Sequence, residues 1–129
     1  MGYPRNIRHL DELEAFEVIL AVDQDLEFFA DHPKAPENRP FVAVPIDLAR
    51  VLLIPMSRQY HYARWDDIVF LSSKGQRSLI SLSYQETVYW DDLLDSNKRY
   101  FGRRHVRVID KLPTEVIKEL EDHLRGITP

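Results

Sequence analysis

The chain of 129 residues contains no cysteine. This absence excludes a disulfide framework, a thiolate metal site, a cysteine nucleophile and thiol redox chemistry. Only four glycines are present, and none lies at the spacing of a phosphate-binding loop. No apolar run approaches the ~20 residues that a membrane helix needs, and residues 1–11 lack the apolar stretch of a signal peptide. We therefore expect a soluble, cytoplasmic protein with no membrane partner.

Metal and hydrolase motifs are missing too. The chain contains no His-Glu-x-x-His sequence and no Gly-x-Ser-x-Gly sequence. Its five histidines are too far apart in the sequence to place two metal ligands on one face of a helix or strand. The sequence therefore predicts no metal and no other cofactor.

The composition is that of an ordinary globular protein. Hydrophobic residues make up 44% and charged residues 29% of the chain, which argues against disorder. The length fits a single domain over residues 1–129, and a chain of this size can bury roughly two-thirds of its unfolded surface.

Charge is unevenly distributed along the chain. The formal net charge is −4, so the protein as a whole is not a polybasic nucleic-acid binder. Residues 11–37 contain nine acids and one base, whereas residues 98–107 are rich in arginine and contain Tyr100 and Phe101. The two regions are either solvated faces or the mark of an anionic partner on one side of the molecule.

Short apolar runs predict a mostly β protein. Strands are expected at 16–22, 40–46, 50–54, 67–71, 78–83, 86–89 and 106–109, with a short amphipathic helix at 9–15 and one helical turn at 91–94. Residues 23–38 predict a long loop. Residues 47–49 either close a hairpin or begin a helix with Asp47 as its N-cap.

The C-terminal part of the sequence predicts a helix. Pro113 suits its start, and Val116, Ile117, Leu120 and Leu124 form one apolar stripe that should pack on the sheet. The expected fold class is therefore mostly β with helices (α+β). We expect a small antiparallel sheet or a partly open SH3-like barrel with a C-terminal helix.

The order of several segments resembles the MazF/PemK family of toxin ribonucleases. Residues 38–44, Asn-Arg-Pro-Phe-Val-Ala-Val, resemble the family's Arg-Pro-Ala-Leu-Val strand. Residues 51–59, Val-Leu-Leu-Ile-Pro-Met-Ser-Arg-Gln, resemble its Val-x-x-x-Pro-Leu-Thr-Ser-Gln segment. The resemblance covers about residues 16–125. The family's Gly-Asp-Ile start is missing, and the short connection at 47–49 looks more like the related ribonucleases of type III toxin–antitoxin systems.

The resemblance implies a metal-independent endoribonuclease of toxin–antitoxin type. Its substrate would be single-stranded RNA, it would form a homodimer, and an antitoxin partner would neutralise it. Arg39 matches the family's catalytic arginine and would stabilise the phosphorane, while Ser57 matches the catalytic threonine and would position the phosphate. We expect both residues in one cleft at the open end of the hairpin. As a loop residue, Arg39 should be replaceable by alanine without unfolding the protein.

Other candidate substrate-binding residues come from the residue types themselves. Gln59 suits a phosphate or a base edge, and His61 suits a general base. The neighbouring aromatic residues Tyr60, Tyr62 and Trp65 suit either base stacking or packing. The alternative for each polar candidate is an ordinary exposed position, or a capping position in the case of His61.

The basic stretch provides the remaining candidates. If residues 103–108 form a strand, Arg103, His105 and Arg107 share the outward face, and Val106 and Val108 point inward. The outward row would then contact an RNA backbone. The alternative function is a non-catalytic interaction or inhibitor module that uses the acidic 11–37 surface.

Overall fold

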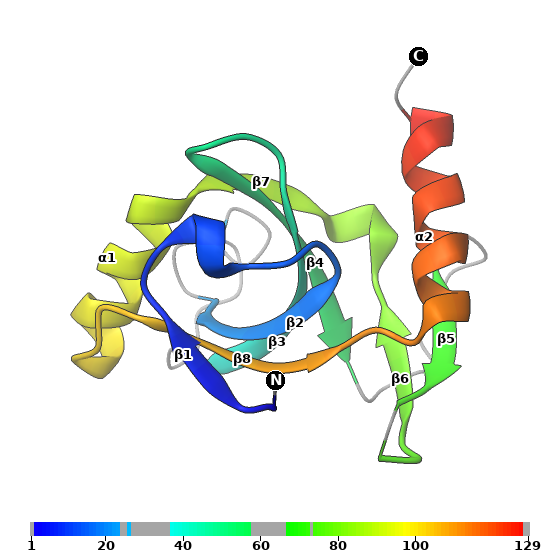
Figure 1. The fold of residues 1–129 in the computed structure, drawn as a ribbon, viewed down its shortest axis with the longest axis horizontal. Helices are drawn as coiled ribbons and strands as arrows, with labels where there is room; N and C mark the ends of the chain where they lie inside the picture. Colours follow the sequence, from blue (N-terminus) through cyan, green and yellow to red (C-terminus); the bar gives the residue numbers. More distant parts are fainter. Residues whose placement is uncertain (1, 24–25, 27–36, 58–66, 73, 128–129) are drawn as a thin grey trace.

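The computed structural model describes residues 2–23, 26, 37–57, 67–72 and 74–127. Its strands are β1 (Arg5–Ile7), β2 (Glu17–Val22), β3 (Asn38–Pro45), β4 (Arg50–Ser57), β5 (Ile68–Leu71), β6 (Arg77–Ile80), β7 (Glu86–Tyr89) and β8 (Val106–Lys111). Two α-helices, α1 (Trp90–Phe101) and α2 (Thr114–Ile127), lie on opposite sides of the molecule in Figure 1. Two single-turn 3-10 helices span Leu10–Glu12 and Leu82–Tyr84.

The strands form one antiparallel sheet that is strongly curved and not closed. Their order is β1-β8-β2-β3-β4-β6-β5, and β7 pairs with the first half of β4. This arrangement, with a C-terminal helix, confirms the expected α+β class. Within the described residues, no helix is long and apolar enough to cross a bilayer.

The central hairpin confirms one of the two interpretations of residues 47–49. β3 and β4 pair directly, from Phe41 opposite Pro55 to Pro45 opposite Val51. The Asp47 carboxylate accepts hydrogen bonds from the backbone N–H groups of Ala49 and Arg50 at 2.9 and 2.8 Å. Asp47 therefore caps a tight turn, and the competing prediction of a helix here is wrong.

Helix α1 is much longer than the single turn expected at 91–94. Trp90, Leu93, Leu94 and Asn97 are buried on one side of it at helical spacing. Acids in its first turn and bases in its last suit the helix dipole. Gly102 ends it in the left-handed conformation, with φ 72°. The start of the basic stretch is thus helical, and the following strand begins only at Val106.

Smaller elements also differ from the expectation. A 3-10 turn at Leu10–Glu12 replaces the short helix predicted at 9–15. The strand predicted at 78–83 ends at Ile80, where a second 3-10 turn follows. Strand β1 was not expected, because three residues are too few to form a readable pattern.

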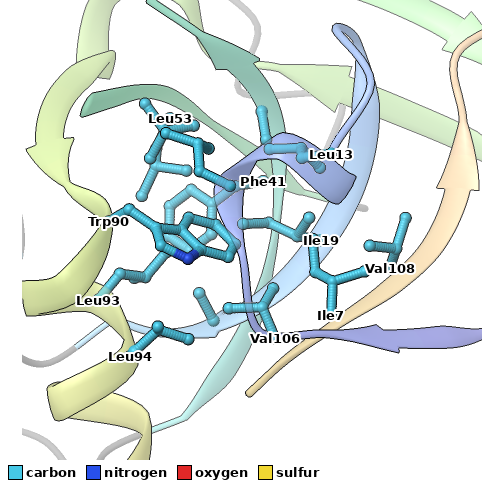
Figure 2. Close-up of a cluster of buried hydrophobic side chains, with 14 of the residues drawn as sticks. Ile7, Leu13, Ile19, Phe41, Leu53, Trp90, Leu93, Leu94, Val106 and Val108 are labelled. Atoms are coloured by element: carbon cyan, nitrogen blue, oxygen red, sulfur yellow. The ribbon is translucent and has the colours of Figure 1, made fainter. Parts of the chain in front are cut away.

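Two hydrophobic cores lie on the two faces of the sheet. The first core, shown in Figure 2, is enclosed by the curved sheet and covered by α1 through Trp90, Leu93 and Leu94. The second core lies on the outer face, under α2 and against the β5–β6 hairpin. Leu120 is completely buried there, and Ile117 and Leu124 are partly buried against the same cluster. The predicted packing of the C-terminal helix is confirmed.

Candidate nucleic-acid interface

Arg39 is the second residue of β3 and is anchored by acidic neighbours. Its Nε donates to Asp23 Oδ2 at 3.2 Å, and its Nη2 lies 3.6 Å from Glu37 Oε2. The Asp23 side chain is completely buried and also accepts a hydrogen bond from the Glu37 backbone N–H. Arg39 therefore lies in strand β3 and not in the expected loop, and it is paired with two acids. Its side chain still keeps 24% of its surface exposed.

Strand alternation separates Arg39 from its two neighbours. Arg39 pairs with Ala21 of β2, which belongs to the first core. Asn38 and Pro40 fall on the other, outer face of the strand, since successive side chains of a strand point to opposite faces. The guanidinium of Arg39 is thus held at the end of β3 beside Asp23.

Three predicted binding residues lie together on the outer side of the molecule. Arg103, His105 and Arg107 line a hollow of about 200 Å³, the basic hollow. Its other lining residues are Leu20, Asn38, Asn97 and Phe101. Val106 and Val108 are completely buried, which confirms the predicted alternation of β8. The outward row begins before the strand, however, because Arg103 and His105 belong to the connection from α1.

Asn97 fixes the floor of the basic hollow. Its Oδ1 accepts a hydrogen bond from Val22 N–H at 3.1 Å, and its Nδ2 donates to the His105 carbonyl at 3.0 Å. One buried amide thus connects α1 to the end of β2 and to the start of β8. Sequence reasoning missed this residue. The available signal was a polar side chain seven positions after Trp90, on the buried side of a helix.

Ser57 lies in a second hollow, between the β5–β6 hairpin and the connection from β8 to α2. It pairs with Leu79 of β6, where β4 leaves β3. This hairpin hollow has a volume of about 290 Å³. Its lining residues are Val18, Pro40, Met56, Ser57, Phe70, Ser72, Lys74, Gln76, Ser78, Ile109, Asp110, Lys111, Leu112 and Pro113.

The two hollows are neighbours on the outer face of three adjacent strands. β2 contributes Leu20 to the basic hollow and Val18 to the hairpin hollow. β3 contributes Asn38 and Pro40 in the same way, and β8 contributes Arg107 and then residue 109. Positions two apart share a face and lie roughly 6–7 Å apart along a strand. The hollows therefore form one continuous surface.

Arg39 and Ser57 were expected in one cleft, but in the structure they lie at the same end of the hairpin in different surroundings. The last paired rung of the hairpin joins Phe41 and Pro55, so both candidates lie beyond it at the same open end. Ser57 lines the hairpin hollow, whereas Arg39 is not among its lining residues and is held by Asp23. The two residues share an end of the hairpin but have different surroundings.

The remaining candidates cannot be placed. Gln59 and His61 lie outside the described residues, as do the aromatic residues Tyr60, Tyr62 and Trp65. Across the described ranges, no three histidine, aspartate or glutamate side chains come close enough together to hold a metal ion.

The acidic stretch is not a uniform surface. Glu17 is completely buried, and its two carboxylate oxygens accept hydrogen bonds from both terminal nitrogens of Arg5, from Tyr3 Oη and from Glu14 N–H. Burial alone raises the pKa of Glu17, but these hydrogen bonds outweigh it, so the pKa lies below its ordinary value. Among the acids of this stretch that the structure describes, Glu17 and Asp23 are buried and each is paired with an arginine.

Comparisons with protein-family models, with curated proteins and with solved structures found no match. The MazF/PemK resemblance therefore rests on the sequence segments alone.

Proposed function

We propose that this protein is a metal-independent endoribonuclease of toxin–antitoxin type that acts on single-stranded RNA in the cytoplasm. The basic hollow is the observation that carries the proposal. Arg103 and Arg107 lie exposed at one hollow of the outer face, with His105 between them and Asn38 from the strand of Arg39. Arginine suits a phosphate because its planar fork of N–H donors matches the phosphate oxygens.

The charge distribution favours this function over the acidic interaction module. Among the residues that the structure describes, no aspartate or glutamate lines the basic hollow. Of the described acids of the 11–37 stretch, Glu17 and Asp23 are buried and each is paired with an arginine. An RNA backbone on the outer face would therefore meet cations, although the protein carries a net negative charge.

Cleavage requires few groups. The 2′-hydroxyl loses its proton and attacks the adjacent phosphorus, the P–O5′ bond breaks, and the leaving 5′-oxygen takes up a proton. The products are a 2′,3′-cyclic phosphate and a 5′-hydroxyl, and no external oxidant or reductant is needed. The protein must stabilise the extra negative charge on the phosphorane, where one preset donor contributes about 2.7–4 kcal/mol.

By resemblance, Arg39 would be this donor, although its side chain lies on the first-core face of β3 and lines neither hollow. Asp23 fixes one edge of its guanidinium, and the partly exposed side chain lies where β3 begins. Ser57 lies at the end of the paired strand β4, where a hydroxyl can orient a phosphate oxygen. By resemblance, the active form would be a homodimer and an antitoxin would cover this surface.

Arg39→Lys is the sharpest test, because Arg39→Ala would leave the buried Asp23 carboxylate without its arginine. Losing a charged hydrogen-bond partner of a buried carboxylate costs about 1–3 kcal/mol, so alanine would confuse stability with catalysis. Lysine keeps a positive charge beside Asp23 but lacks the planar fork. We expect the lysine variant to melt close to the wild type and to cleave labelled single-stranded RNA about 100- to 1000-fold more slowly in EDTA.

The matched control is Arg125→Lys, in an arginine of α2 whose side chain is 75% exposed. It should cleave like the wild type. Wild-type protein that makes no discrete cuts in EDTA, or an Arg39→Lys variant with full activity, would contradict the proposal.

A further inference from the structure

The hairpin hollow has a lining that positioning of a phosphate by Ser57 does not require. Its lining includes the apolar residues Val18, Pro40 and Phe70. Phe70 and Ser78 are directly opposite each other across the β5–β6 ladder, so both side chains lie on the same side of the hairpin. In the same lining, serine hydroxyls and the Gln76 amide offer donors and acceptors.

The size of the hollow limits its occupant. Pockets for drug-sized ligands are commonly ~300–1000 Å³, and the volume here is about 290 Å³. One planar ring system with a few polar edge atoms fits this space better than a larger ligand does. An aromatic side chain in the lining, such as Phe70, can stack on the face of any nucleobase.

The charge around the hollow indicates what the ring is attached to. Lys74 and Lys111 lie in the lining with one acid, Asp110. Lys111 is 3.1 Å from Glu14, so part of its charge is already matched. The adjoining basic hollow, with Arg103 and Arg107, adds cations on the same face. The surface therefore suits a flat apolar group next to an anion, which describes a nucleotide within an RNA strand.

We propose that the hairpin hollow is the subsite for one unstacked base of the RNA, and that a neighbouring phosphate lies in the basic hollow. The inference rests on the proposed function in that it takes single-stranded RNA as the ligand. Binding of one base is separable from cleavage, because stacking and phosphate contact do not need the 2′-hydroxyl to react.

Filling the hollow tests the subsite directly. Ser78→Phe places a ring beside Phe70, and Gln76→Trp changes an exposed residue near the hairpin turn, where folding is less at risk. The probe is a short single-stranded RNA with 2′-O-methyl groups, which cannot be cleaved, and binding is followed by fluorescence anisotropy at several salt concentrations. We expect about 5- to 150-fold weaker binding, the equivalent of one lost base stack.

The salt dependence separates a base contact from a phosphate contact. A base contact does not neutralise a phosphate and so releases no counterions when it forms. Both hollow-filling variants should therefore keep the wild-type slope of log affinity against log salt. Thr87→Phe, an exposed position of β7 outside both hollows, is the matched control and should bind like the wild type.

An abasic scan identifies the base. Removing the base at one position of the probe should weaken wild-type binding by the same factor, and should cause no further loss in Ser78→Phe, because the two changes remove one contact. If no abasic position behaves in this way, or if both hollow-filling variants bind at full strength, the subsite is wrong. An apolar peptide side chain as the natural occupant would give that result.

The two proposals can fail separately. Wild-type protein that binds the probe with these signatures but does not cleave ordinary RNA would support the base subsite and contradict the ribonuclease proposal. If the protein cleaves RNA but no abasic position has a smaller effect in Ser78→Phe than in the wild type, the ribonuclease proposal is supported and the subsite is contradicted. No binding of RNA at any salt concentration would overturn both.

Discussion

At the residue scale, two buried carboxylates hold the ends of β2. Glu17 begins the strand and is bound by Arg5, and Asp23 follows the strand and is bound by Arg39. Both acids belong to the acidic stretch of the sequence. Leaving either acid without its arginine would be costly, because a buried charge needs a partner. The same arrangement has a structural role at one end of β2 and, in our proposal, a catalytic role at the other.

The Glu17 network predicts a pH dependence of stability. Its pKa in the folded protein lies below the ordinary value of 4.5, because the hydrogen bonds from Arg5, Tyr3 and Glu14 N–H outweigh burial. The stabilisation is therefore fully present above pH 4.5 and is lost as the pH falls through the lower, folded-state pKa. Replacing Glu17 with glutamine should cost about 1.5–3 kcal/mol of unfolding free energy at neutral pH and flatten this acid loss.

Denaturant unfolding measured at intervals from neutral pH to pH 3 checks the prediction. Glu14→Gln is the control, because the Glu14 side chain is 68% exposed. It should change the unfolding free energy by less than about 0.5 kcal/mol. An unchanged acid dependence in Glu17→Gln would show that other carboxylates cause it.

At the element scale, the sequence predicted those strands that have a short, regular apolar pattern. The strands at 16–22, 50–54 and 67–71 are β-rich apolar runs, and all correspond to observed strands. The sequence predicted only one turn of α1, because the fourth position of the helix's buried stripe is Asn97, a polar residue that breaks the apolar pattern. Its burial depends on the Val22 amide and the His105 carbonyl, partners that no local pattern reveals.

The candidate site divides in the same way. The alternation around Val106 and Val108 could be predicted because it is a property of one strand. The anchoring of Arg39 by Asp23 could not, because it depends on how the chain between them returns to the sheet. The hairpin hollow likewise forms only when segments distant in the sequence come together.

The contact of α2 with the outer face predicts a large effect of one substitution. Leu120 is completely buried in the second core. Leu120→Ala should lower the unfolding free energy by about 2–5 kcal/mol through lost transfer energy and the cavity left behind. Urea unfolding should show a lower midpoint with an unchanged slope. The neighbouring exposed position, in Glu119→Ala, should shift the midpoint little, and equal stability of the two variants would contradict the packing.

At the scale of the whole molecule, charge is sorted by position rather than by total. The protein is acidic overall, yet the described lining of the basic hollow contains two arginines and a histidine and no acid. Two acids of the N-terminal half, Glu17 and Asp23, are buried and form ion pairs with Arg5 and Arg39. An anionic polymer can therefore bind one face of a net anionic protein, and such binding should depend strongly on salt.

The double substitution Arg103→Ala with Arg107→Ala should reveal this dependence. Both side chains are exposed, so the fold should be unaffected. Each phosphate contact on single-stranded RNA contributes about 0.7 to the slope of log affinity against log salt, so losing two should make the slope less steep by about 1.4. Anisotropy titrations of the uncleavable RNA from low to moderate salt measure the slope. The control, Lys118→Ala with Arg125→Ala on α2, removes the same charge from the protein. A control that flattens the slope equally would mean that RNA responds to net charge alone. A slope change seen only when Arg103 and Arg107 are replaced would indicate that the RNA lies across β8 and β2.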